Sequence, residues 1–287
     1  MGGIPPGTAV DLRLWALAFT VLDWTERQKA ECWAALQADA QPHLTPAQAE
    51  ALARLEADLP RRQQEAQALN ARLLLPGDPG VDDLLAPLPY PVALWVRGTL
   101  PPAKGPRLAI VGSRQASPRG QARTRAWAKA LTQAGVAVLS GLARGIDGAA
   151  HAGALEAGPT WGVLGSGLNH PYPPEHQPLM DRMVAADGGV LTPFPPEARP
   201  LKWHFPRRYW LLAAWTEGVL VTEARLRSGS LVTARLALDL GKELWVCPGA
   251  PEDSSAEGPN ALLREGAARI CLSPEGLIED LYLSRTP

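Results

Sequence analysis

Six short apolar runs after residue 107 constrain the fold of this chain more than any other feature. Each run is bounded by Gly, Ser or Pro, and in order they read LAIVG, VAVLSG, TWGVLG, GGVLT, GVLVTEA and ELWVCPG. Helix-compatible stretches lie between them, over residues 118–134, 147–157, 174–186, 205–214 and 230–240. Continuous apolar strands that alternate with helices indicate a mostly parallel sheet covered on both faces. The sequence therefore predicts a doubly wound α/β domain over residues 107–287.

The N-terminal quarter of the chain contains no convincing strand. A first apolar stretch ends near Asp23, and Thr25 then opens a second segment whose apolar residues recur at helical spacing. Thr45 precedes a proline at the start of a third segment, and residues 61–75 suit a fourth helix. This region carries 7 basic and 9 acidic side chains, a balance typical of a plain accessory domain. The sequence predicts a small all-helical domain over residues 1–75.

Residues 76–106 differ sharply in composition because they hold eight prolines. Proline removes a backbone donor and clashes with the preceding helical turn, so long helices are excluded here. Only VALWVRG, residues 92–98, has the pattern of a strand, at a sheet edge or in a hairpin. We interpret the segment as a proline-rich linker with an edge strand that packs against the following domain.

Small, hydroxylated and basic residues follow four of the predicted strands. In a parallel sheet the carboxyl ends of the strands meet at one edge, where helix N-termini present free amides. Glycine lets a ligand approach the backbone, serine supplies a hydroxyl, and arginine pairs with phosphate oxygens through two N–H groups. The four segments are residues 112–114, 140–147, 165–168 and 223–230. Their convergence predicts a phosphate or anion site.

Local charge supports such a site although the whole chain is nearly neutral. The formal net charge is −1, which argues against a uniformly basic nucleic-acid coat protein. Residues 104–144, however, hold eight basic side chains and no acidic one. A second basic cluster, over residues 199–208, is interleaved with aromatic residues, of which Phe205 fits base stacking and core packing about equally. Cations that follow a backbone beside stacking rings are what single-stranded nucleic acid requires.

Several catalytic and metal-binding patterns are absent from the sequence. There is no GxxxxGKS/T loop, and the glycine spacings after residues 140 and 164 differ from the dinucleotide fingerprint. Asp147 and His151 share a helix face, but without a third ligand nearby a local hydrogen bond explains them better than a metal or an acid–base pair. Cys247 lacks a histidine partner, and we place it in the core. The sequence therefore indicates a binding protein without cofactor, metal or catalytic set.

The compartment follows from what the sequence lacks. No apolar run approaches the ~20 residues needed to cross a bilayer, and the N-terminus lacks the basic-then-apolar layout of a secretion signal. Three cysteines are too few and too scattered for a disulfide framework. We expect a cytoplasmic protein with no membrane span.

Taken together, the motifs closely resemble those of the DNA-processing protein A (DprA, or Smf) family. They are AIVGSRQASPRG, VLSGLARGIDGAAHAGALEAG, YPPEH, FPRRYWLLAAW, TEARLRSGSLVTARLALDLGKELWVCPG and GPNALLREGA, in matching order from about residue 92 to 281. The resemblance implies an extended Rossmann-like domain, preceded by a SAM-like helical domain, that binds single-stranded DNA without sequence preference, usually as a homodimer. It further implies protection of incoming DNA and loading of RecA during natural transformation, with displacement of single-strand-binding protein and no catalytic reaction.

The resemblance also assigns binding roles to residues that match the family's motifs. The implied DNA and phosphate contacts are Gly112, Ser113, Arg114, Ser140, Gly141, Leu142, Ala143, Gly145, Lys202, Phe205, Arg207, Arg208, Arg227, Ser228, Gly229 and Ser230. Phe205 is the implied stacking ring. The chain departs from the family at Tyr209, where an asparagine is usual. Many members also carry a C-terminal winged-helix domain, which we do not expect within residues 107–287, so functions of that domain are not carried over.

A nucleotide-binding enzyme or sensor is the alternative interpretation, because related Rossmann-like folds bind nucleotides or cleave their glycosidic bonds. A nucleoside monophosphate phosphoribohydrolase would need an acidic residue in the glycine-rich pocket, and Glu223 and Asp147 are the candidates. Neither lies in a PGGxGTxxE-type motif. A pure interaction scaffold, the third interpretation, does not explain why basic residues gather at strand ends.

Overall fold

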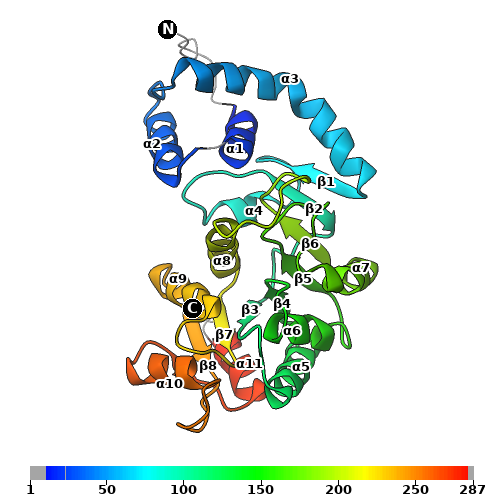
Figure 1. The fold of residues 1–287 in the computed structure, drawn as a ribbon, viewed down its shortest axis with the longest axis vertical. Coiled ribbons are helices and arrows are strands. Elements are labelled where there is room, and N and C mark those ends of the chain that lie inside the picture. The colour runs from blue at the N-terminus through cyan, green and yellow to red at the C-terminus, as the bar shows by residue number, and fades with distance from the viewer. Residues whose placement is uncertain (1–10, 23, 284–287) are drawn as a thin grey trace.

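A nine-stranded sheet forms the centre of the computed structural model, which describes residues 11–22 and 24–283 (Figure 1). Its strands lie in the order β1-β2-β6-β5-β4-β3-β7-β8-β9. From β6 to β9 all neighbours are parallel, whereas β1 and β2 are added antiparallel at the β6 side. The strand bounds are β1 Ala71–Leu74, β2 Leu94–Gly98, β3 Arg107–Val111, β4 Ala137–Ser140, β5 Thr160–Val163, β6 Gly189–Thr192, β7 Gly218–Val221, β8 Glu243–Val246 and β9 Arg269–Ile270.

Helices cover both faces of this sheet, as the alternating runs predict. In β3, Leu108 and Ile110 pack with α5 and α6, whereas Ala109 and Val111 belong to the core beneath α8 and α9. The bounds are α4 Asp82–Leu85, α5 Pro118–Gln133, α6 Ile146–Ala154, the 3₁₀ turn η1 Pro174–His176, α7 Gln177–Ala185, α8 His204–Ala214, α9 Gly229–Asp239, α10 Glu257–Arg264 and α11 Pro274–Leu283. The predicted doubly wound, mostly parallel α/β fold is confirmed.

Three helices precede the sheet, and their starts follow the predicted caps. They are α1 Leu12–Val21, α2 Glu26–Gln37 and α3 Pro46–Ala68. Thr25 and Thr45 each accept a hydrogen bond from the third helical amide, and a glutamine there accepts one from the capping residue's own amide. Asp23, near which the first apolar stretch was expected to end, lies outside the described residues.

Two predictions for the segment between the helices and the sheet are wrong. No separate fourth helix forms, because α3 continues through the exposed Pro60 as far as Ala68. Asn70 then turns the chain with φ 52°, and residues 71–74 form strand β1. VALWVRG is consequently not an edge strand, since β2 pairs with β1 on one side and β6 on the other. Its antiparallel pairing with β1, the preceding strand, agrees with the other predicted position, a hairpin. β1 thus covers backbone groups that β2 would otherwise expose.

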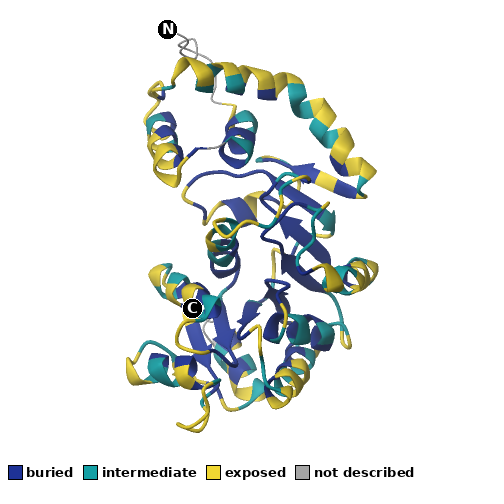
Figure 2. Ribbon diagram, viewed as in Figure 1, coloured by how far each residue is buried: buried dark blue, intermediate teal, exposed yellow. Residues whose placement is uncertain are grey.

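The α8 helix lies between the sheet and the N-terminal helices, and one core spans this junction (Figures 1 and 2). Phe19 of α1 and Leu211 of α8 belong to the same buried cluster. The Trp215 indole donates to the carbonyl of Leu84 at 2.8 Å, which fixes the end of α8 to α4. Because this core is continuous, the division of the chain at residues 75 and 106 stays a prediction. Across the described residues, no helix combines the length and apolarity that a membrane crossing requires.

Candidate functional site

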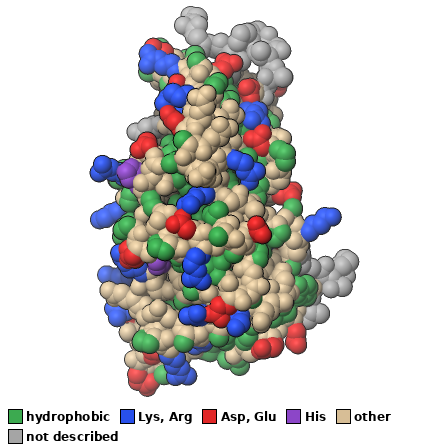
Figure 3. All heavy atoms as spheres, turned by 90° about the vertical axis from the view of Figure 1, so that its right-hand side faces the viewer, with side chains coloured by type: hydrophobic (Ala, Val, Ile, Leu, Met, Phe, Trp, Pro, Cys, Tyr) green, Lys and Arg blue, Asp and Glu red, His purple; other side chains and the backbone are tan. Residues whose placement is uncertain are grey.

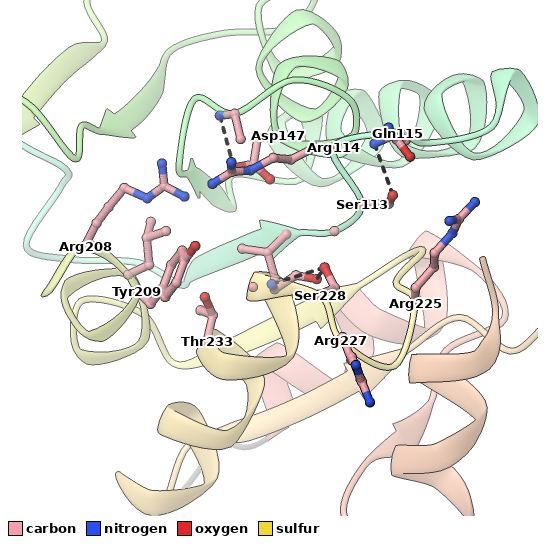
Figure 4. A pocket seen from close by; sticks show the side chains of 16 residues that line it. Ser113, Arg114, Gln115, Asp147, Arg208, Tyr209, Arg225, Arg227, Ser228 and Thr233 are labelled. Atoms are coloured by element: carbon pink, nitrogen blue, oxygen red, sulfur yellow. Dashed lines mark hydrogen bonds between the residues drawn. The ribbon is translucent and has the colours of Figure 1, made fainter. Parts of the chain in front are cut away.

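A pocket of about 540 Å³ opens where the strand order reverses. The chain leaves β3 for β4 on one side and returns later to β7 on its other side, so the loops after β3 and β7 diverge. Such a switch point is where open α/β sheets bind ligands. Figure 4 shows side chains from both loops, from α8 and from α9 around this space. The lining residues are Val111, Gly112, Ser113, Arg114, Gln115, Ala143, Asp147, Arg208, Tyr209, Leu212, Arg225, Arg227, Ser228, Gly229, Ser230 and Thr233.

Hydrogen bonds join the segment after β3 to the segment after β7 beside the pocket. The Ser113 amide donates to the carbonyl of Glu223 at 2.7 Å. The Glu223 carboxylate accepts from the amide of Ser117 at 2.9 Å and from its hydroxyl at 2.6 Å. Ser117 in turn caps α5 by accepting from the Gly120 amide at 2.9 Å. Glu223 is therefore engaged at the start of α5 and does not line the pocket, which removes it as the acid of a nucleotide-cleaving enzyme.

The loop after β4 packs directly against the loop after β3. Gly145 adopts φ +73°, and a Cβ there would lie 2.2 Å from the carbonyl oxygen of Ser113. The next amide, of Ile146, donates to that same oxygen at 3.2 Å. Only glycine permits this approach. The contact starts α6 beside the pocket and brings Asp147 into its wall.

Asp147 and Arg208 are buried charges of opposite sign in this wall. Arg208 donates through Nη1 to the carbonyl of Gly141 at 2.8 Å, and Asp147 accepts from the Ala143 amide at 3.2 Å. Burial raises the pKa of Asp147, and the Arg208 charge opposes that shift. Burial likewise lowers the pKa of Arg208, opposed by Asp147. Each charge therefore makes the other less costly to bury.

Phe205 lies beside the pocket in contact with two arginines. The guanidinium carbons of Arg114 and Arg208 lie 5.2 and 5.0 Å from its ring centroid, within cation–π range. The Tyr172 ring lies 6.4 Å from Phe205, with the Arg144 guanidinium 5.9 Å from the tyrosine centroid. These five side chains line a small recess, and Arg114 and Arg208 line the main pocket as well. The recess and the pocket therefore meet at the two arginines.

The N-terminus of α9 forms the opposite wall. Ser228 caps the helix, and the first-turn amides next to it favour an anion. Gly229 accommodates the Tyr209 side chain, whose hydroxyl would lie 2.6 Å from a Cβ at that position. Tyr209 also lies against Arg208, with the guanidinium carbon 5.1 Å from its ring centroid. The tyrosine that replaces the family's asparagine is thus part of the pocket.

The structure brings most of the sequence-predicted residues together. Nine of the sixteen line the pocket, namely Gly112, Ser113, Arg114, Ala143, Arg208, Arg227, Ser228, Gly229 and Ser230. Phe205 lines the adjoining recess. Their assembly follows from the strand ends, because the sheet places those loops side by side.

Four predicted residues lie behind the pocket and shape its loops. The Ser140 hydroxyl donates to the Ile110 carbonyl at 2.5 Å, so it is used within the sheet. Leu142 is fully buried with φ +59°. Gly141 and Gly145 supply close backbone approaches, to Arg208 and to the β3 loop respectively.

Two predicted basic residues lie elsewhere. Arg207 points away from the pocket and donates to the Phe19 carbonyl at 3.4 Å, with its guanidinium carbon 6.0 Å from the Tyr90 ring centroid. Lys202 is exposed before α8 and lines neither the pocket nor the recess. Consecutive helical residues point about 100° apart, which is why Arg207 and Arg208 face different partners.

Seven lining residues were not among the predicted sixteen, namely Val111, Gln115, Asp147, Tyr209, Leu212, Arg225 and Thr233. Arg225 lies two residues before Arg227 in the motif TEARLRSGS, so the motif that predicted Arg227 could also have predicted Arg225. Gln115 follows Arg114 directly, and Thr233 lies one helical turn beyond Gly229 on α9. Only helical spacing could have indicated Thr233.

Asp147 and His151 do not bond to each other. His151 is fully buried, and its Nδ1 lies 2.9 Å from the Thr160 hydroxyl, whereas Asp147 lines the pocket. Over residues 11–22 and 24–283 no group of three His, Cys, Asp or Glu side chains could hold a metal ion. Cys247 is buried in the core, as expected, and burial raises its thiol pKa to about 11.

Acidification is expected to destabilise the fold through His151. Burial lowers its pKa from 6.5 to about 3, so the folded ring stays neutral while the unfolded ring gains a proton below 6.5. A base with a depressed folded pKa stabilises the fold fully above 6.5 and loses that contribution as pH falls towards about 3. At about 1.4 kcal/mol per pH unit, this group lowers the unfolding free energy by about 2 kcal/mol between pH 7 and pH 5. Urea titrations of the wild type and His151→Gln at both pH values measure it, and equal losses in the two proteins would contradict it.

The chain is similar in sequence to known proteins over most of its length. A family model described as DNA recombination-mediator protein A matches residues 81–282. Protein Smf of Escherichia coli is 42% identical over 199 residues, which are 69% of this chain and 53% of that protein. The chain therefore spans about half the length of this curated relative.

Two solved structures share the fold. The structure of DNA processing protein A from Streptococcus pneumoniae superposes with a TM-score of 0.75 at 28% identity, covering 93% of this chain and 96% of that one. A structure of DNA processing protein A from Helicobacter pylori, concerned with its single-stranded DNA binding mode, superposes with a TM-score of 0.65 at 28% identity. It covers 75% of this chain and 96% of that one. These matches confirm the extended Rossmann-like architecture.

Proposed function

This chain belongs to the DNA recombination-mediator protein A family, and on that premise we propose that it binds single-stranded DNA without sequence preference at the β3–β7 switch point. The observation that carries the proposal is the position of Phe205. Its ring lies against Arg114 and Arg208 where the recess meets the pocket. A ring for a base, next to guanidinium groups for a phosphate, is the pairing that single-stranded nucleic acid requires.

The lining supports binding without sequence preference. Arginines, serine hydroxyls and the positive N-terminal end of α9 suit phosphate oxygens, and phosphate contacts position a strand without reading its bases. An aromatic ring accepts any base, since every base has a π-face. The pocket therefore binds the backbone and the flat faces, which are common to all sequences.

The partial burial of Phe205 supports a single strand over a duplex. The ring lies in a recess beside Tyr172 and Arg144 and is only partly accessible. A base must leave its stack to reach such a ring, and unpaired bases do so at far lower cost than paired ones.

Positive charge is concentrated at this site. On the face seen in Figure 3, basic and acidic side chains are interspersed, in keeping with a net charge of −1. The pocket, by contrast, is lined by four arginines and one aspartate. Local charge at the mouth is what attracts a polyanion to a nearly neutral protein.

The proposed cellular role extends this binding. The protein acts in the cytoplasm as a homodimer that protects incoming single strands and loads RecA recombinase on them during natural transformation, in place of single-strand-binding protein. The description of the family as a DNA recombination mediator supports this role.

Removing two arginine side chains tests whether the pocket is the DNA-binding site. We expect the double variant Arg114→Ala/Arg227→Ala, which removes two arginines of the pocket, to bind an oligothymidylate about 100-fold more weakly at low salt, because two charged phosphate contacts are lost. The slope of log affinity against log salt should become less steep by about 1.4, since each single-strand phosphate contact contributes about 0.7. Gel shifts across a salt series measure both quantities.

The matched control is Arg54→Ala, which removes an exposed arginine of α3 that pairs with Glu50. It should leave affinity and slope unchanged. If the double variant keeps the wild-type affinity for DNA and the wild-type salt slope, the pocket is not the DNA-binding site.

A further inference from the structure

Trp203 is unusually exposed for its residue type. It presents 71% of its surface to solvent, more than any other Phe, Trp or Tyr in the described ranges. Most of the protein's ten tryptophans are fully or largely buried. A large exposed ring marks an interaction site, because burying it is strongly favourable.

The ring is held in place at the start of α8. Trp203 lies edge-on to His204, with ring centroids 6.2 Å apart, and His204 stacks on Phe194 at 3.9 Å. Phe205, two residues along, lines the recess. The exposed ring and the recess therefore share one end of the same helix.

Charge next to Trp203 is positive. Lys202 and Arg199 are both exposed, and neither forms an ion pair within the part of the chain that the structure describes. The nearby Glu197 carboxylate accepts a hydrogen bond from Asn169, and its Oε2 lies 3.8 Å from His170 Nε2. Glu197 therefore interacts with these two residues and not with Lys202 or Arg199. An occupant of this surface should be a polyanion with flat apolar faces.

We propose that Trp203 is a base-stacking platform outside the pocket, which takes a base of the same strand whose neighbouring nucleotides bind at the pocket. The inference rests on the proposed function and deepens it, because it extends the strand's path over Lys202 at the N-terminal end of α8. Leu201, 37% exposed, is the other exposed apolar side chain at this position. Two such side chains are far too few for the core of a protein interface, which favours DNA as the occupant.

Substitution of the ring tests the platform. Trp203→Ala should weaken binding of a 20-nucleotide oligothymidylate about tenfold, within the range measured for one stacked base. Trp203→Phe should recover most of that loss, because a smaller ring still stacks. The control Trp127→Phe, which changes a partly buried tryptophan of α5, should bind as the wild type does. Unchanged affinity in Trp203→Ala overturns the inference.

Quenching by acrylamide gives a second readout that does not depend on affinity. The wild type and Trp127→Phe should show a readily quenched fraction of fluorescence that Trp203→Phe lacks, and oligothymidylate should protect it. An accessible Trp203 that DNA at saturating concentration leaves unprotected overturns the platform and assigns the ring to another occupant.

The two proposals fail in different ways. If Arg114→Ala/Arg227→Ala loses affinity while Trp203→Ala does not, the pocket is the binding site and the platform is ruled out. If all of these variants bind as tightly as the wild type, the proposed function fails together with the platform.

Discussion

Arg208→Met is expected to weaken single-stranded DNA binding by at least about 100-fold and to destabilise the fold by about 3 kcal/mol. The guanidinium lines both the pocket and the recess, so its removal takes away a proposed phosphate partner and a contact of Phe205 together. Stability falls because the Asp147 carboxylate stays buried without the cation that favours its ionised form. Gel shifts measure the first effect and urea unfolding the second.

A second substitution separates the two effects. Arg208→Met/Asp147→Asn removes the orphaned carboxylate, so it should regain most of the lost stability while binding stays weak. The DNA affinity of Arg208→Lys should lie between those of the wild type and Arg208→Met, because lysine keeps the charge but lacks the planar guanidinium group that pairs with phosphate. Full binding by the stabilised double variant would show that Arg208 acts on the pocket only through the fold.

Gly153→Ala should destabilise the protein by about 3 kcal/mol, since the site cannot hold a methyl group. A Cβ at Gly153 would lie 2.0 Å from the Arg125 carbonyl oxygen, where α6 crosses α5. The helices must separate to admit it. Because α6 carries Asp147 at its other end, DNA binding should weaken in parallel with the unfolding free energy.

Gly276→Ala is the matched control for this packing effect. Gly276 is exposed in α11, and a Cβ there would meet only the Ser273 hydroxyl oxygen at 3.6 Å, an ordinary contact. Alanine is a better helix former than glycine, so this variant should be neutral or more stable by up to about 1 kcal/mol. Equal losses from both substitutions would show that the α5–α6 contact is not the cause.

The sheet and the site's location could be predicted because they follow from local pattern. A parallel strand buried on both faces needs an unbroken apolar run, and GVLV and LAIV are such runs. Once the strands are known to be parallel, their carboxyl ends meet, and the residues that follow them meet too. Gly112, Arg114, Ser228 and Gly229 were found in this way.

Strand β1 and the orientation of α8 could not be predicted in the same way. The sequence ARLL suits a helix as well as a strand, and only pairing with β2 decides between them. Arg207 and Arg208 carry the same charge in adjacent positions, so composition cannot tell which faces the pocket. The packing of α8 against α1 on one side and the sheet on the other decides it, and that contact joins residues far apart in the chain.

The pairing of β3 with β7 also governs when the site can come into existence. The two strands join residues about 110 positions apart, such as Leu108 and Gly218. A chain still emerging from the ribosome already contains the arginine of the first loop, but the opposite wall, at Ser228 and Gly229, has yet to be synthesised. Closing so long a loop is among the slower steps of folding. The pocket is therefore a late product of synthesis and folding, absent from every unfinished chain that stops short of α9.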